Sequence, residues 1–140
     1  MRVISQLPTN DWKRSSVRAK WAEAAGYDGV SSSELAHDPF MPLAIASQET
    51  RDVQLGTSIA VAFPRSPMVT ANIGWDLNAQ SGGRFELGLG SQVKGHNERR
   101  FSTPWLAPVP RLREYVQSIR AIWRCWEYGE PLKFEGEHYQ

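Results

Sequence analysis

Residues 81–91, Ser-Gly-Gly-Arg-Phe-Glu-Leu-Gly-Leu-Gly-Ser, decide the fold more than any other part of the chain. The glycine pair at 82 and 83 is typical of a helix end, the run 84–89 alternates like a strand, and glycines at 88 and 90 then open the backbone. Glycine lets main-chain N–H groups approach a ligand closely, and α/β folds bind ligands at the carboxyl ends of their strands. The stretch therefore predicts a binding site directly after a strand.

Working outward, the same strand-then-helix pattern occurs three more times. Strands are predicted at 2–6, 27–34, 53–61 and 84–89, and helices at 11–25, 39–49, 67–81 and 110–128. Strand starts separated by roughly 25–30 residues are typical of a parallel α/β sheet. Two forms remain open: a doubly wound sheet, or the first four βα units of a (β/α)8 barrel, which needs about 250 residues.

Three further features concern packing. The first helix has a predicted apolar face made of Val17, Trp21, Ala24 and Ala25. The last predicted helix carries a wide apolar stripe from Leu112 to Trp126, which indicates a core or interface helix. Segment 133–139 alternates around a glycine and predicts a small hairpin.

Composition limits the classes of partner. The net charge of +1 over 140 residues gives no electrostatic reason to expect nucleic acid or an anionic membrane. A single cysteine, Cys125, excludes an internal disulfide framework, and no His, Asp or Glu cluster has metal-ligand spacing. No apolar run approaches the roughly 20 residues that span a bilayer, so we expect a cytoplasmic protein without a metal.

Several ordered segments together resemble the luciferase-like monooxygenase superfamily, in particular its branch that uses the deazaflavin coenzyme F420. These segments are 24–30 (AAGYDGV), 53–58 (VQLGTS), 81–90 (SGGRFELGLG), 111–115 (RLREY) and 134–139 (FEGEHY). The resemblance implies a (β/α)8 barrel, of which residues 1–140 would be the amino-terminal part.

The resemblance also implies cofactor-binding positions. It places a cis peptide between Ser58 and Ile59, in a bulge behind a flavin-type ring; the alternative is an ordinary trans bond in a buried strand. Gly88, Gly90, Ser91 and Gln92 would offer N–H and hydroxyl donors to the polar tail of the cofactor. The alternative for these four residues is a tight strand-to-loop turn.

Candidate catalytic residues follow the second predicted strand. Many relatives place an acid and then a histidine here, whereas this chain has Glu34, then Leu35, with His37 two places later. Glu34 is expected to line the site, and His37 either replaces the missing histidine or is simply solvated. Farther on, 92–105 is predicted as a polar loop in which His96 and Asn97 are positioned for a site lid or substrate contact. Arg99-Arg100 would either reach an anionic cofactor tail or form a solvated basic turn.

The resemblance implies an oxidoreductase that transfers a hydride between F420 and a small-molecule substrate, within a homodimer. Two alternatives stay open. One keeps the fold but uses reduced FMN for oxygen insertion, because the two ring systems have similar shapes. The other is a truncated binding or structural chain without catalytic activity, since half a barrel exposes sheet edges that favour association.

Overall fold

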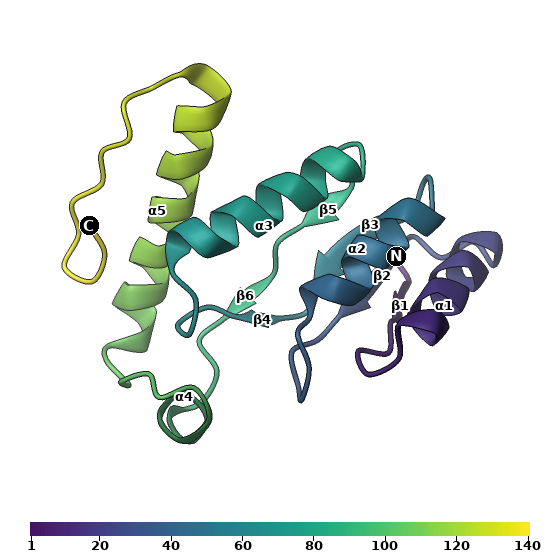
Figure 1. Cartoon of the computed structure of the whole chain (residues 1–140), viewed down its shortest axis with the longest axis horizontal. Helices are drawn as coiled ribbons and strands as arrows, with labels where there is room; N and C mark the ends of the chain where they lie inside the picture. Colours follow the sequence, from purple (N-terminus) through teal and green to yellow (C-terminus); the bar gives the residue numbers. More distant parts are fainter. The chain divides into compact units, whose positions relative to one another are not determined.

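Four parallel strands form the sheet that the sequence predicts, and they lie side by side in chain order (Figure 1). They are β1 (Ile4–Gln6), β2 (Gly29–Ser32), β3 (Gln54–Thr57) and β5 (Phe85–Glu86). The computed structural model describes all of residues 1–140 as two compact units, one of residues 1–60 with 74–89 and the other of residues 61–73 with 90–140. The sheet belongs to the first unit.

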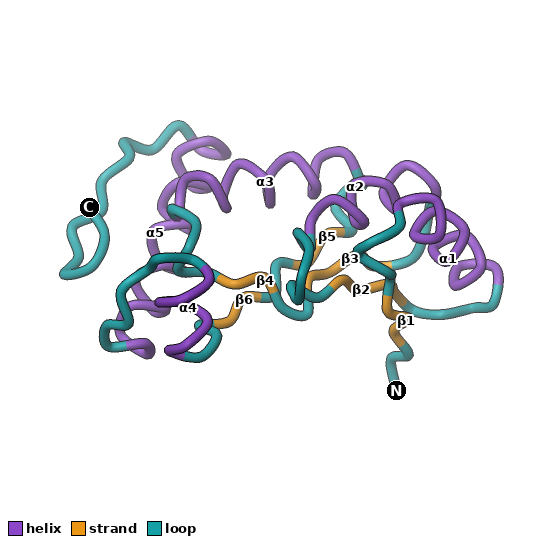
Figure 2. Tube along the Cα trace, turned by 60° about the horizontal axis from the view of Figure 1, so that its bottom comes forward, coloured by secondary structure: helices purple, strands orange, loops and turns teal.

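Helices α1 (Trp12–Ala24) and α2 (Phe40–Glu49) both lie on one face of this sheet (Figure 2). The carboxylate of Asp11 accepts the N–H of Arg14 at 3.1 Å, and that of Asp38 accepts the N–H of Phe40 at 2.8 Å. These capping bonds satisfy N–H groups that a helix start leaves without partners. Sequential parallel strands with helices on one face are the arrangement of the first βα units of a (β/α)8 barrel; a doubly wound sheet carries helices on both faces.

The register of the sheet decides which side chains meet the helices. Ser5, Val30, Leu55 and Phe85 form one row across the four strands. Val30 and Leu55 are buried in a core with alanines of both helices and with Leu43 of α2, so this row faces the helices. Because side chains alternate along a strand, the neighbouring row faces the other way.

The buried face of α1 differs from the predicted one. Ser15, Ala19 and Ala22 are buried, whereas Val17 is 68% exposed and Trp21 is 46% exposed. Small side chains let the helix axis approach the sheet closely, so burial follows residue size more than hydrophobicity here. The prediction of an apolar face at Val17 and Trp21 was wrong.

Two predicted strands are each divided in the structure. Predicted strand 53–61 becomes β3 and the short β4 (Ala60–Val61), and predicted strand 84–89 becomes β5 and β6 (Leu89–Gly90). β4 and β6 pair in a separate two-stranded sheet. Between β3 and β4 the Ser58–Ile59 peptide bond is cis, at the position where the resemblance placed it.

In the second unit, α5 (Pro108–Tyr128) is the long helix that the apolar stripe predicts. It begins two residues earlier than predicted because Pro108 suits a first helical turn. Its Tyr115 is fully buried and hydrogen-bonds Thr70 on α3 (Pro67–Gln80). No helix of the chain is both long and apolar enough to span a membrane.

Two local predictions in this unit were wrong. The predicted polar loop contains helix α4 (Lys94–Arg100), whose seven residues are too few to show an apolar period. The predicted hairpin at 133–139 is absent. Instead, the carboxylate of Glu114 on α5 accepts the N–H groups of Glu137 at 3.2 Å and His138 at 2.7 Å, so these groups are not used in a ladder.

Candidate functional site

The candidate site lies on the face of the four-stranded sheet that turns away from α1 and α2, which we call the open face. Gln6, Ser31, Gly56 and Glu86 form the row that points this way. Positions two residues farther along three of the strands, Ser33, Ser58 and Gly88, continue the same alternation. A cavity of about 350 Å³ lies over this face and is lined by residues that include Ile4, Ser31, Gln54, Gly56, Ser58 and Gly88.

Uncharged polar groups form a continuous hydrogen-bonded chain at the carboxyl ends of the first three strands. The amide of Gln6 accepts the hydroxyl of Ser31 at 2.9 Å and donates to the hydroxyl oxygen of Ser33 at 2.8 Å. The Ser33 hydroxyl donates to the carbonyl oxygen of Ser58 at 2.7 Å. Three separate strands are thus joined by groups that carry no charge.

The cis bond is fixed on both sides by backbone hydrogen bonds. The N–H of Ser58 donates to the carbonyl of Ser32 at 2.8 Å, and the carbonyl of Ile59 accepts the N–H of Glu34 at 3.1 Å. Ser58, Ile59 and Glu34 are therefore brought together at one edge of the sheet.

The two predicted catalytic residues have different surroundings. The side chain of Glu34 is buried, with 6% of the residue exposed, and its backbone is bonded beside the cis bond. His37 is exposed to solvent in the loop between β2 and α2. Of the two, only Glu34 is held against the rest of the candidate site.

Gly88 forms two hydrogen bonds with the side chain of Thr57 on the neighbouring strand. The Thr57 hydroxyl donates to the carbonyl of Gly88 at 2.7 Å and accepts its N–H at 2.9 Å. A Cβ atom on Gly88 would lie 2.0 Å from the carbonyl oxygen of Thr57. Glycine is required here by the approach of the two backbones, and its N–H group is used within the protein.

The other predicted cofactor residues, Gly90, Ser91 and Gln92, belong to the second unit. The carbonyl of Gly90 accepts the N–H of Ala62 at 3.0 Å. The side-chain nitrogen of Asn97, a fully buried residue, donates to the carbonyl of Ser91 at 2.9 Å. Gln92 has a positive φ of 58°, and its side-chain oxygen accepts the N–H of Val93 at 3.0 Å.

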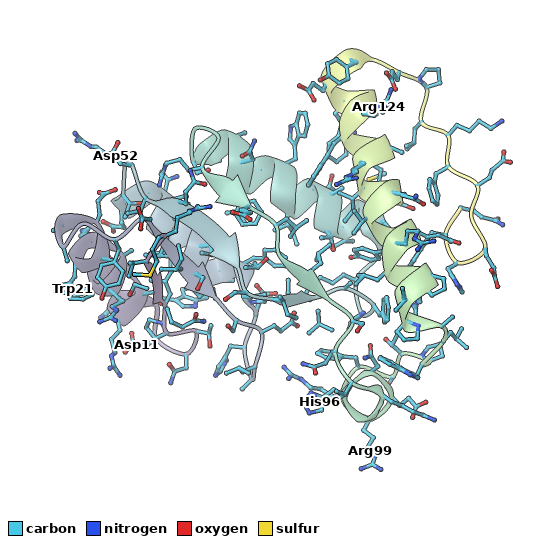
Figure 3. The ribbon with its side chains drawn as sticks, turned by 180° about the vertical axis from the view of Figure 1, so that it is seen from behind. Asp11, Trp21, Asp52, His96, Arg99 and Arg124 are labelled. Atoms are coloured by element: carbon cyan, nitrogen blue, oxygen red, sulfur yellow. The ribbon has the colours of Figure 1, made fainter.

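Helix α4 carries the remaining candidates of the predicted loop. His96 and Arg99 project from it into solvent (Figure 3). The guanidinium of Arg100 lies 4.7 Å from the centre of the Phe101 ring. Asn97 is the one polar residue of this helix that is turned inward, and its side chain holds the loop after β6.

Sequence reasoning missed Gln6, Ser31 and Ser33. From the sequence, residues 31–33 are assigned only to the predicted strand 27–34 and to no site. The sequence nevertheless contains a signal for a polar site. Ser31 and Ser33 lie two positions apart at the end of a parallel strand, so their side chains share one face of the sheet. Gln6 ends the preceding strand, so its amide is placed next to that face.

A group of potential metal ligands was also not expected from spacing. Glu114, Glu137 and His138 place one ligand atom each within 4.8 Å of one another. The backbone N–H of His138 holds the pKa of Glu114 below its usual range, and the N–H of Glu137 acts in the same direction. The hydrogen bonds that the Glu114 carboxylate accepts from Glu137 and His138 therefore hold the C-terminal segment against α5.

Comparison with known proteins extends over almost the whole chain. The model of the luciferase-like monooxygenase family matches residues 3–140. The uncharacterized protein Rv1360 of Mycobacterium tuberculosis is 50% identical over 139 residues, a match that covers 99% of this chain and 41% of that relative. The chain thus spans about two fifths of the length of this relative.

Solved structures agree with the fold. The FMN complex of the oxygenating constituent of 3,6-diketocamphane monooxygenase from Pseudomonas putida superposes with a TM-score of 0.82 at 17% identity, covering 99% of this chain and 43% of that one. Coenzyme F420-dependent tetrahydromethanopterin reductase from Methanopyrus kandleri gives a TM-score of 0.79 at 19% identity, covering 99% and 44%. At these identities the likeness concerns the fold, while the family match rests on the sequence itself. The chain belongs to the luciferase-like monooxygenase family.

Proposed function

We propose that this chain is part of an oxidoreductase that transfers a hydride between a small-molecule substrate and the deazaflavin coenzyme F420. The open face carries the proposal. A cavity over this face is lined by hydroxyl, amide and glycine residues and by the charged residues Arg2 and Glu86. The hydrogen-bonded chain from Gln6 to Ser58 lies at the carboxyl ends of the strands, which is where α/β folds bind their ligands.

The residues around the cavity fit a planar ring. Ser31, Gly56 and Gly88 line part of it with a hydroxymethyl group or no side chain at all, so little protrudes from the sheet at these three positions. The remainder is lined by the larger side chains of Arg2, Ile4, Gln54 and Glu86. Its volume of about 350 Å³ lies within the range of roughly 300–1,000 Å³ that is usual for ligand pockets. Ser58 adds a hydroxyl at the rim, next to the cis bond.

In this proposal the cofactor supplies the hydride chemistry, and the protein supplies position and protonation. Gln6 and Ser33 hold the end of β3 in place through their hydrogen bonds. Glu34 is the proposed acid–base group beside the site, because it is buried and its backbone N–H donates to the carbonyl of Ile59 next to the cis bond. His37 faces solvent and has no role in the proposed step.

The second candidate cofactor is FMN, which would make the protein a monooxygenase. The specific observation in its favour is the FMN-bound diketocamphane monooxygenase, whose structure matches the same region of fold. The hydroxyl and amide groups of the open face suit either ring, and a binding measurement distinguishes the two cofactors.

The test is a titration of the purified protein with oxidised F420 and, separately, with FMN, followed by the fluorescence and absorbance of each ring. NADH serves as a control for nonspecific binding of a redox cofactor. We expect saturable binding of F420. Saturable binding of FMN alone would replace the proposal by the monooxygenase alternative, and binding of neither would overturn it in favour of a non-catalytic chain.

A second measurement tests the role of Glu34. With F420 bound, Glu34→Gln is expected to slow substrate turnover at least tenfold while leaving the affinity for F420 within about twofold. Glu98→Gln, at an exposed position on α4, is the matched control and should behave as the unaltered protein. Equal turnover in all three proteins would remove Glu34 from the proposed step.

A further inference from the structure

We infer that the hydroxyl group of Ser58 donates a hydrogen bond to the ligand of the open face, and that Gln6 and Ser33 are positioning residues that leave its proton available. This inference rests on the proposed function and deepens it. It identifies an atom of this chain that would favour a hydrogen-bond acceptor, such as a carbonyl oxygen, on the bound ring.

The direction of the hydrogen-bonded chain is set at Gln6. Its side-chain oxygen accepts from Ser31 at 2.9 Å, and its side-chain nitrogen donates to Ser33 at 2.8 Å. The opposite orientation of the amide would require the Ser33 hydroxyl to donate to Gln6. The carbonyl of Ser58 would then lose the donor that lies 2.7 Å away.

Ser33 has only one hydroxyl proton, and the carbonyl of Ser58 takes it. The hydroxyl oxygens of Ser33 and Ser58 lie 3.4 Å apart. In that contact Ser33 can act only as the acceptor, and the separation is long compared with the usual distance of about 2.7–2.8 Å between hydroxyl oxygens. The proton of Ser58 is therefore weakly held within the protein.

The position of Ser58 makes this proton accessible. The residue is exposed and lines the cavity over the open face together with Gly56 and Gly88. An acceptor atom placed at a normal hydrogen-bond distance would compete successfully with the long contact to Ser33. Deazaflavin and flavin rings both carry carbonyl oxygens at one edge, so either ring offers such an acceptor.

The experiment compares Ser58→Ala, Ser58→Thr, Gln6→Leu and the double variant Gln6→Leu/Ser58→Ala with the unaltered protein. For each protein, the dissociation constants of oxidised F420 and FMN, the absorption maximum of the bound ring and the thermal unfolding midpoint are measured. Gln80→Leu, at an exposed position at the end of α3, is the control for loss of a glutamine.

We expect Ser58→Ala to weaken binding of the preferred ring about fivefold and to shift its absorption maximum, with an unchanged unfolding midpoint. Ser58→Thr, which keeps a hydroxyl, should retain both properties. Gln6→Leu should weaken binding too, and the double variant should lose no more than Ser58→Ala alone, because both changes act through one hydroxyl.

Two results would overturn the inference while leaving the proposed function standing. One is that Ser58→Ala binds the ring as tightly, and with the same absorption maximum, as the unaltered protein. The other is that the effects of Gln6→Leu and Ser58→Ala add fully in the double variant, since the two residues would then act independently. If the unaltered protein bound neither ring, the proposed function itself would fail, and this inference with it.

Discussion

The guanidinium of Arg84 lies 2.7 Å from the carbonyl oxygen of Val53 and joins the start of β5 to the start of β3. It also donates to the carbonyls of Ser47 and Thr50 at the end of α2, at 3.2 and 3.0 Å. The carbonyls at the end of a helix have no partner within the helix. One side chain thus closes the end of α2 and fixes the strand that leads to Gly88.

Replacement of Arg84 by lysine should destabilise the first unit. Lysine keeps the charge but cannot supply the planar fork of donors that reaches several carbonyls at once. We expect the free energy of unfolding to fall by about 2 kcal/mol, measured by denaturant titration. Arg99→Lys is the matched control, because Arg99 is exposed on α4, and an equal loss in both variants would refute this role of Arg84.

Glu23 gives the protein a sensitivity to acid. Burial disfavours its charged form, but the backbone N–H groups of Asp52, Arg51 and Val53 and the charge of Arg84 outweigh this and hold the pKa of Glu23 below its usual value. A lowered pKa in the folded state contributes stability above the unfolded pKa of about 4.3, and that stability is lost as the pH falls through the folded pKa.

We therefore expect Glu23→Gln to be less stable than the unaltered protein at pH 7, and the difference to shrink as the pH is lowered below about 4.3. The measurement is the unfolding midpoint in denaturant between pH 7 and pH 3. Glu98→Gln on α4 should follow the unaltered protein at every pH. A difference for Glu23→Gln that stays constant with pH would argue against the ionised contact.

Gly88→Ala should prevent normal folding of the first unit. Its methyl group would lie 2.0 Å from the carbonyl oxygen of Thr57, which belongs to the backbone and cannot move away as the end of a flexible side chain could. We expect little soluble protein, or an unfolding midpoint lowered by more than 10 °C, because clashes of this kind cost several kcal/mol. Gly95→Ala, where an added Cβ meets nothing within 4 Å, should fold normally.

Tyr115→Phe tests the buried hydroxyl pair of the second unit. The Tyr115 and Thr70 hydroxyls hydrogen-bond each other, and both residues are fully buried. Removal of one hydroxyl leaves the other with a poorer partner, so we expect a loss of about 1–2 kcal/mol in denaturant unfolding. Tyr128→Phe is the control, because Tyr128 is 66% exposed and should tolerate the change without loss.

The strands and most helices could be predicted because their signals are local. Asp11 and Asp38 mark helix starts with side chains that cap the backbone, and the stretch 81–91 marks the end of α3 and the last strand of the sheet. The cis bond at Ser58 was located only through a family resemblance, since no local property of Ser-Ile favours it.

What could not be predicted depends on contacts between distant residues. The burial of Ala19 instead of Trp21 is decided by how closely a helix can approach a sheet, which hydrophobic spacing does not report. The C-terminal segment is held by Glu114, some 23 residues earlier in the chain, where a local pattern suggested a hairpin. The chain from Gln6 to Ser58 needs three strands in register before its members become neighbours.

The two hydrogen bonds from the side chain of Asn97, to the carbonyls of Ser91 and Val93, also bear on motion. They connect the loop after β6 to α4. A displacement of this loop must therefore either move α4 with it or break the hydrogen bonds of Asn97. A ligand that displaces Ser91 would therefore also change the position or the stability of α4. The rate of amide hydrogen exchange in residues 94–100 should therefore report ligand binding at the loop, although no residue of the helix has to contact the ligand.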